Sequence, residues 1–165
     1  MPWLVRKVLR YASLSLQIAH GVTLSDNKTD GVTEKYGDIN STDGPVSTIH
    51  IKQSVNPGGF DSEGTYLVDG TAHRESLPIF GDVLMRLRYI KVEDVPDEEL
   101  RRSLYDGTPS KIIIDEVAHN ETRGWDARVF WGFEMIDGKR YFTRNVSTTK
   151  GKETVVCRIV YTHRG

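Results

Sequence analysis

Arg144 is the side chain whose type and position most directly suggest chemistry. In the segment 139–148, Phe142 and Val146 define one face by their period-two spacing, and Arg144 lies on that face. If the face is buried, the guanidinium needs an acceptor: a ligand carbonyl, enolate or carboxylate, or, without ligand, water or a carboxylate such as Glu116. The alternative is that the opposite face is buried and Arg144 lies in water.

Two further side chains could act as an acid or a base. Glu116 follows Ile112 and Ile114 with a period of two and could face the interior as a base, or face outward into solvent. His73 titrates near neutral pH, which suits proton transfer, although its segment 69–75 resembles a strand end or loop. We find no Ser-His-Asp arrangement, phosphate-binding glycine loop or metal-ligand spacing, and we therefore expect no metal or organic cofactor.

Apolar residues of the segment 125–136 are candidates for a ligand-binding wall. One face carries Trp125, Ala127, Val129, Trp131, Phe133 and Met135, and the other carries Asp126, Arg128, Phe130 and Glu134. We expect the apolar face to be the interior, where it either fills the core or lines a cavity. The predicted ligand-binding residues are Trp125, Val129, Trp131, Phe133, Phe142, Tyr161, Ile159, Met85 and Tyr89.

β-strands must position these side chains, because strand patterns dominate the rest of the sequence. Alternation begins over 14–18, and further strand candidates follow at 46–54, 64–69, 83–92, 111–119, 125–136, 139–148 and 154–162. The dipeptide Asp137-Gly138 is the strongest two-residue hairpin signal.

Two helices and one long loop interrupt the strands. Apolar spacing predicts a helix over 2–11, and a second helix is expected near 96–104, with Asp94 as its cap and Pro96 in its first turn. The polar segment 26–45 is expected to be a long loop, with room for a strand around 32–35.

The composition narrows the class of protein. A chain of 165 residues with net charge -1 and no basic stripe fits one domain, 1–165, that does not bind nucleic acid. The single cysteine, Cys157, excludes an intrachain disulfide framework and a cysteine-based zinc site. We expect no membrane span, a cytoplasmic location and a monomer or small homo-oligomer. Four N-x-S/T sequons, expected to be by-products of a Ser/Thr-rich chain, begin at Asn27, Asn40, Asn120 and Asn145.

Many hairpin-linked strands with few helices predict an all-β fold. The expected fold is an antiparallel up-and-down β-barrel with a short N-terminal helix and one helical insertion. A barrel of this size has room for one small ligand, expected to be apolar.

Several motifs resemble the calycin superfamily of fatty-acid-binding and lipocalin-like barrels. The segment 134–139 (EMIDGK) is similar to the penultimate hairpin of the fatty-acid-binding branch, and 156–161 (VCRIVY) to its final strand. The segments 124–127 (GWDA), 131–134 (WGFE) and 141–144 (YFTR) resemble a group of small, uncharacterised lipocalin-like fungal proteins, a similarity that extends from about Leu16 onward.

The resemblance implies a calycin-like barrel but not a simple fatty-acid ligand. Fatty-acid binders hold a carboxylate with two arginines and a tyrosine. Their arginine positions correspond to Phe133 and Ile159 here, and only Tyr161 is retained. The haem-binding motif of nitrobindins is missing, so haem is not indicated.

Two functions agree with these observations. The first is a cyclase or isomerase that shapes a polyketide- or terpenoid-like intermediate of secondary metabolism, because such reactions need mainly shape and one or two polarising groups. The second is a non-catalytic carrier or sensor of an apolar metabolite. A buried polar group without a structural partner would favour the enzyme.

Overall fold

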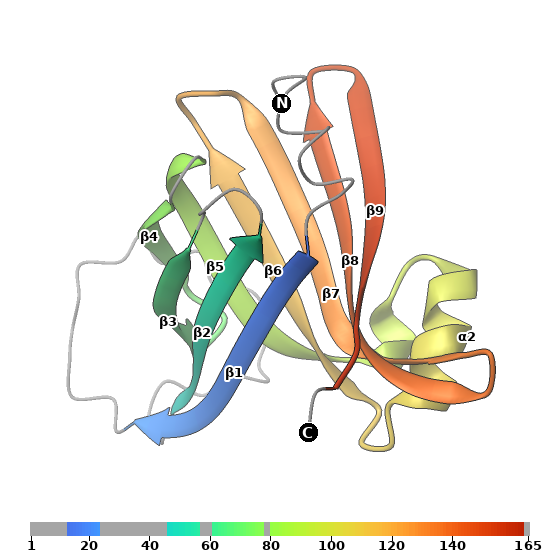
Figure 1. Ribbon diagram of the computed structural model, residues 1–165. Helices are drawn as coiled ribbons and strands as arrows, with labels where there is room; N and C mark the ends of the chain where they lie inside the picture. Colours follow the sequence, from blue (N-terminus) through green and yellow to red (C-terminus); the bar gives the residue numbers. More distant parts are fainter. Residues whose placement is uncertain (1–12, 24–45, 57–60, 78–79, 164–165) are drawn as a thin grey trace.

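The computed structural model describes residues 13–23, 46–56, 61–77 and 80–163 of the chain (Figure 1). Strands make up most of this part of the chain. They are β1 (Ser13–Thr23), β2 (Val46–Asn56), β3 (Ser62–Val68), β4 (Ala72–Leu77), β5 (Gly81–Lys91), β6 (Ile112–Asn120), β7 (Trp125–Ile136), β8 (Lys139–Lys150) and β9 (Glu153–Tyr161). A 3-10 turn, η1 (Val92–Asp94), and the helix α2 (Glu98–Gly107) follow β5.

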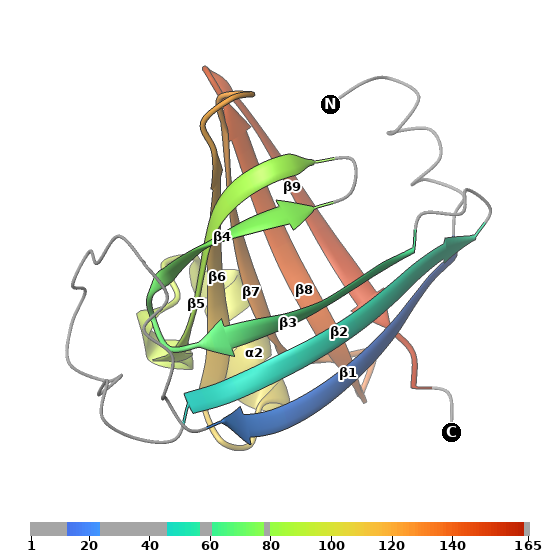
Figure 2. The same cartoon turned by 90° about the vertical axis from the view of Figure 1, so that its left-hand side faces the viewer.

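The strands form two antiparallel sheets that face each other. β1, β2 and β3 form one sheet, and β4 to β9 form the other in chain order, so each sheet is an up-and-down meander. Figure 2 shows the three-stranded sheet crossing one face of the six-stranded sheet, with α2 on its opposite face. The six-stranded sheet is therefore covered on both sides over part of its area.

The closed barrel expected from the sequence is not confirmed. In the described part of the chain, no ladder joins β3 to β4 or β9 to β1. The break after β3 has a local cause: Asp69 accepts a hydrogen bond from the backbone N–H of Thr71, and Gly70 adopts a φ of 75°. This corner carries the chain from one sheet to the other.

The predicted strands agree closely with the observed ones. β7 has the expected limits, and the turn at Asp137 and Gly138 has φ values of 50° and 74°, as a two-residue hairpin requires. The interpretation of segment 69–75 as a strand end or loop holds for residues 69–71 and is wrong from Ala72 onward, because β4 begins there and pairs along β5. The predicted helix 2–11 and the whole predicted loop 26–45, with its possible strand around 32–35, lie outside the described residues.

The N-cap of helix α2 lies three residues later in the chain than predicted. Asp97, not Asp94, is the N-cap, and its carboxylate accepts a hydrogen bond from the backbone N–H of Leu100 at 2.7 Å. Asp94 instead ends the 3-10 turn that leads out of β5.

Two apolar clusters hold the fold together. The larger one fills the space between the sheets, and the smaller one joins α2 to the outer face of the six-stranded sheet. The members of the larger cluster are Ile49, Ile51, Val68, Val83, Met85, Leu87, Ala118, Val129 and Trp131. Those of the smaller are Ile90, Val92, Val95, Leu104, Ile113 and Phe130. Because α2 covers Phe130, both faces of β7 are buried near this residue.

Two of the four sequon asparagines have structural roles. Asn120 is 1% exposed, and its amide donates to the carbonyls of Phe80 and Asp82. Asn145 donates to the Glu134 carboxylate at 2.7 Å. In the described residues, no helix has the length and apolar character needed to cross a membrane.

Candidate active site

The register of the six-stranded sheet places two charged side chains between the sheets. Glu116 on β6 lies opposite Leu87 on β5 and Val129 on β7, both of them core residues. Directly opposed residues of antiparallel strands project to the same face. Arg144 on β8 lies opposite Trp131 in the same way. Both charges therefore point toward the three-stranded sheet.

Glu116, Arg144 and Trp131 form one buried polar cluster. The Glu116 Oε2 atom accepts hydrogen bonds from Trp131 Nε1 at 2.7 Å and from Arg144 Nη2 at 3.0 Å. The Arg144 Cζ atom lies 4.4 Å from the centre of the Trp131 ring. The side chains of Arg144 and Glu116 are only 15% and 10% exposed. The sequence left both orientations of Arg144 open, and the structure shows the inward one, with Glu116 as its partner.

The charge of Arg144 is stabilised by its partner rather than by water. Burial alone would lower the pKa of Arg144, but the charge of Glu116 raises it above its ordinary value. Contact with the face of Trp131 adds a cation–π attraction. The guanidinium is thus held in a fixed position with its charge intact.

Tyr161 extends this cluster toward the last strand. Its ring centre is 5.4 Å from that of Phe142, which in turn is 5.6 Å from that of Phe133. Burial raises the pKa of the Tyr161 phenol, and the nearby charge of Arg144 offsets this only in part. The two groups are close enough to interact electrostatically, but no hydrogen bond of good geometry joins them.

Two buried polar atoms of the cluster have unused hydrogen-bonding capacity. In the described part of the chain, Arg144 Nε and the Tyr161 hydroxyl have no hydrogen-bond partner. Buried donors are normally satisfied, because an unmade hydrogen bond costs about 1–3 kcal/mol. These two atoms therefore mark a place where a ligand acceptor would be stabilised.

Two further polar residues on the inner faces were not predicted from the sequence. Glu75 on β4 lies opposite the core residue Val83, and burial raises the pKa of its carboxyl group. Tyr66 on β3 packs against the core; burial raises the pKa of its phenol, as do the charges of Glu75 and Glu116. Period-two alternation with Val68 would have indicated Tyr66, whereas Glu75 was missed because β4 was taken for a loop.

His73 is held by a partner of its own. Its Nε2 atom lies 2.9 Å from Asp69 Oδ2, at the corner between the sheets. This hydrogen bond raises the pKa of His73, against the opposing effect of burial. Burial alone would raise the pKa of the Asp69 carboxyl group, but its hydrogen bond with His73 lowers that pKa. No contact with Arg144 or Glu116 is recorded for His73 within the described residues.

The remaining predicted ligand-binding residues differ in burial. Val129 and Met85 lie in the core at 3% and 5% exposure. Trp125 and Ile159 are half-buried, and the Tyr89 hydroxyl lies 3.1 Å from His20 Nε2 on β1.

The expectation that the whole apolar face of β7 is buried is wrong at its end. Phe133 is 40% exposed and Met135 is 41% exposed. Neither residue belongs to the cluster between the sheets, because the buried part of that face ends at Trp131.

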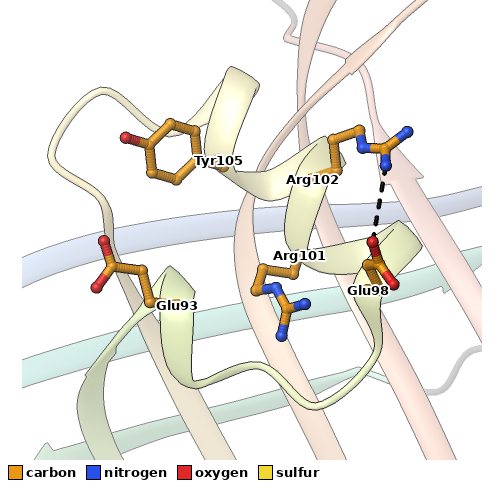
Figure 3. A pocket seen from close by; sticks show the side chains of 5 residues that line it. All are labelled: Glu93, Glu98, Arg101, Arg102 and Tyr105. Carbon is orange, nitrogen blue, oxygen red and sulfur yellow. Dashed lines mark ion pairs between the residues drawn. The ribbon is translucent and has the colours of Figure 1, made fainter.

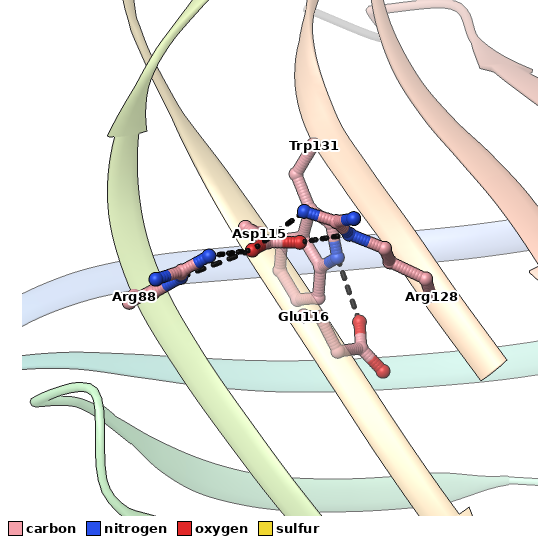
Figure 4. Close-up of polar contacts among 5 residues, drawn as sticks. All are labelled: Arg88, Asp115, Glu116, Arg128 and Trp131. Atoms are coloured by element: carbon pink, nitrogen blue, oxygen red, sulfur yellow. Dashed lines mark hydrogen bonds and ion pairs between the residues drawn. The ribbon is translucent and has the colours of Figure 1, made fainter. Parts of the chain in front are cut away.

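The opposite face of β6 carries a second ionic cluster with a different arrangement. Asp115 is fully buried and accepts two hydrogen bonds each from Arg88 and Arg128. Figure 4 shows Asp115 bridging these arginines while the adjacent Glu116 points away toward Trp131. Asp115 has its charge matched and its oxygens occupied, so we interpret this cluster as structural.

A surface hollow beside α2 contains none of the predicted site residues. It is lined by Glu93, Glu98, Arg101, Arg102 and Tyr105 (Figure 3). Its side chains are mostly exposed, and the Glu98–Arg102 ion pair is 3.8 Å long. Exposed pairs of this kind contribute little, and the hollow lies outside the space between the sheets.

Comparison with known proteins gives two relatives with related descriptions. The chain is 29% identical over 168 residues to the probable pericyclase scpY of Mollisia scopiformis; the alignment spans 100% of this chain and 78% of that protein. It is 28% identical over 169 residues to the pericyclase pydY of an Acremonium species, spanning 100% of this chain and 80% of that protein. No family model and no solved structure matches the chain. The calycin resemblance therefore depends on the sequence motifs, and the full-length similarity is to proteins described as pericyclases.

Proposed function

We propose that this protein is a cyclase of the pericyclase type that needs no metal or organic cofactor. Its substrate would be a flexible polyketide- or terpenoid-like intermediate of secondary metabolism. The observation that carries the proposal is the buried Glu116–Arg144 ion pair against Trp131, which lies between the sheets beside the larger apolar cluster. The full-length similarity to two proteins described as pericyclases supports it.

The interior would act first by shape. Closing a ring within a flexible chain requires its reacting ends to meet in one orientation, which costs conformational entropy in water. Apolar walls such as Trp131, Phe142 and Val129 would hold the chain in a near-attack conformation. We propose that the two sheets are the walls of a calycin-like barrel, within a single domain, that encloses the substrate.

The ion pair would act second, by polarisation. Arg144 is fixed by Glu116 and Trp131 before any substrate arrives. A preorganised cation needs no reorganisation when negative charge grows on the substrate during ring closure. In a pericyclic step, new carbon–carbon σ bonds form from π electrons of the same molecule, so the product has the mass of the substrate.

The non-catalytic carrier is the weaker alternative. A carrier of an apolar metabolite needs apolar walls but has no use for two charges between the sheets, and burying them costs free energy.

Metabolite comparison tests the proposal. Deleting the gene in its host should cause an uncyclised isomer to accumulate, with unchanged mass and more carbon–carbon double bonds than the normal product. The purified, desalted wild-type protein should convert this isomer into the normal product. Tight binding of the isomer without any conversion would support the carrier and overturn the cyclase.

A further inference from the structure

The two unpartnered donors of the buried cluster indicate what the substrate must carry. We propose that the substrate has a ketone- or enolate-type oxygen conjugated to its reacting π system. That oxygen accepts two hydrogen bonds, one from Arg144 Nε and one from the Tyr161 hydroxyl. This inference rests on the proposed cyclase function and specifies the substrate class of the same site.

Arg144 is oriented so that one edge of its guanidinium is left for a ligand. Its Nη2 atom donates to Glu116 at 3.0 Å, and its face lies against Trp131. The Nε atom is buried and makes no hydrogen bond of good geometry in the described part of the chain; the Tyr161 hydroxyl beside it is an acceptor that it does not engage in such a bond. An N–H of a guanidinium can only donate, so the missing partner must be an acceptor.

Tyr161 supplies the second donor. It lies opposite Phe142 on the neighbouring strand, and contact with the Phe142 ring positions its own ring. Its hydroxyl is buried and makes no hydrogen bond of good geometry in the described part of the chain, although it is close enough to Arg144 to interact with it. A tyrosine phenol is protonated at neutral pH, and burial raises its pKa further, so the hydroxyl is available to donate.

The charge balance of the site selects among oxygen ligands. Glu116 already neutralises Arg144, so a full carboxylate would bring a second negative charge beside Glu116. A ketone, or an enolate whose charge is delocalised, needs the two donors without an additional cation.

Hydrogen bonding to such an oxygen would assist ring closure directly. Two donors withdraw electron density from the conjugated alkene, which makes it a better partner for an electron-rich diene. Both donors keep their protons throughout, and no atom or electron enters or leaves the substrate. The stabilisation grows as negative charge develops on the oxygen, so it would accelerate the reaction rather than only tighten binding.

Matched pairs of probes test this inference without knowledge of the natural substrate. Fluorenone and fluorene share one ring skeleton and differ by the ketone oxygen; indanone and indane form a smaller pair. Their affinities are measured by quenching of tryptophan fluorescence for the wild type, Tyr161→Phe and Arg144→Lys. Tyr105→Phe serves as the control, because that hydroxyl lies on the outer side of α2.

Only the ketones should respond to loss of the donors. Tyr161→Phe should weaken ketone binding about 3- to 10-fold and leave hydrocarbon binding within about twofold, since the ring is retained. Arg144→Lys keeps a cation beside Glu116 but removes Nε, and should weaken ketone binding about 10- to 100-fold. Tyr105→Phe should change neither. Circular dichroism confirms that each variant is folded.

Three results would overturn the inference, and they differ in whether they also overturn the proposed cyclase function. If Tyr161→Phe leaves ketone affinity unchanged, or weakens ketone and hydrocarbon equally, the two-donor site is wrong but the cyclase proposal stands. If fluorene carboxylate binds the wild type more tightly than fluorenone, the ligand class is wrong. If neither member of either pair binds the wild type, the protein has no apolar binding space of the proposed kind, and the proposed function is wrong as well.

Discussion

Glu116 and Arg144 should be strongly coupled in their effect on stability. Each is the other's only charged partner among the described contacts, at 3.0 Å and with little exposure. With an effective dielectric constant of about 20, the attraction at this distance is about 5 kcal/mol, and much of it is offset by lost hydration. Removing one partner alone leaves a buried charge without compensation.

A double-mutant cycle gives this coupling a measurable value. Arg144→Met should lower the free energy of unfolding by about 3 kcal/mol, because only the Trp131 N–H would then solvate the Glu116 carboxylate. Glu116→Gln should lower it by about 2 kcal/mol, since the amide oxygen can still accept from Trp131. The double variant leaves no buried charge and should lose no more than about 2 kcal/mol, which gives a coupling energy of about 3 kcal/mol.

Urea unfolding followed by circular dichroism measures all four proteins. The slope of free energy against urea concentration should stay the same, so that the midpoints report stability alone. Additive effects, with a coupling below about 0.5 kcal/mol, would refute the reasoning. That result would mean that the two side chains are solvated separately.

Three further predictions concern residues outside the proposed site. Asp115→Asn should lower the free energy of unfolding, measured with urea, by about 2 kcal/mol, since a fully buried charge is lost while its partly exposed arginines can rehydrate. This variant should bind the probes as the wild type does, and weaker binding would contradict a structural role for Asp115. Gly107→Ala should lower the free energy of unfolding by about 3 kcal/mol in the same assay, because the new Cβ would clash with the backbone of Phe133 under α2. A decrease of less than about 1 kcal/mol would disprove this contact. His73→Gln should lower the free energy of unfolding more at about pH 5.5 than at about pH 9. The raised pKa of His73 means that its charged pair with Asp69 contributes its full stability at low pH, and that this contribution is lost as the pH rises through the pKa of His73. Equal decreases in the free energy of unfolding at both pH values would exclude this pair as a pH-dependent contribution to stability.

Local patterns predicted the parts of the fold that depend on local physics. Alternation located β7 to the residue, and the φ requirements of a tight hairpin located the turn at Asp137 and Gly138. For Arg144 the same alternation left both faces of the strand open, and the inward alternative, with Glu116 as a possible partner, is the one that the structure shows.

Other features depended on contacts that the sequence does not display. Phe130 lies on the more polar face of its strand, and only the position of α2 explains its burial. The polar sequence of β4 concealed Glu75, because its strand is specified by pairing with β5 rather than by apolar alternation. The break between β3 and β4 depends on the hydrogen bond from Thr71 to Asp69 and on the positive φ of Gly70, which period-two alternation does not display, so the period of the sequence could not distinguish two sheets from one closed barrel.

The central claim is that the buried ion pair between the sheets takes part in ring closure. The most direct measurement is the rate at which the purified protein converts the isomer that accumulates in the deletion strain. The wild type is compared with the folded Arg144→Met/Glu116→Gln double variant, which keeps the apolar walls and removes both charges. We predict a product of unchanged mass and a rate lower by about 100-fold in the double variant, the magnitude expected for loss of a preorganised donor. Equal rates for the two proteins would contradict the claim and assign ring closure to the shape of the interior alone.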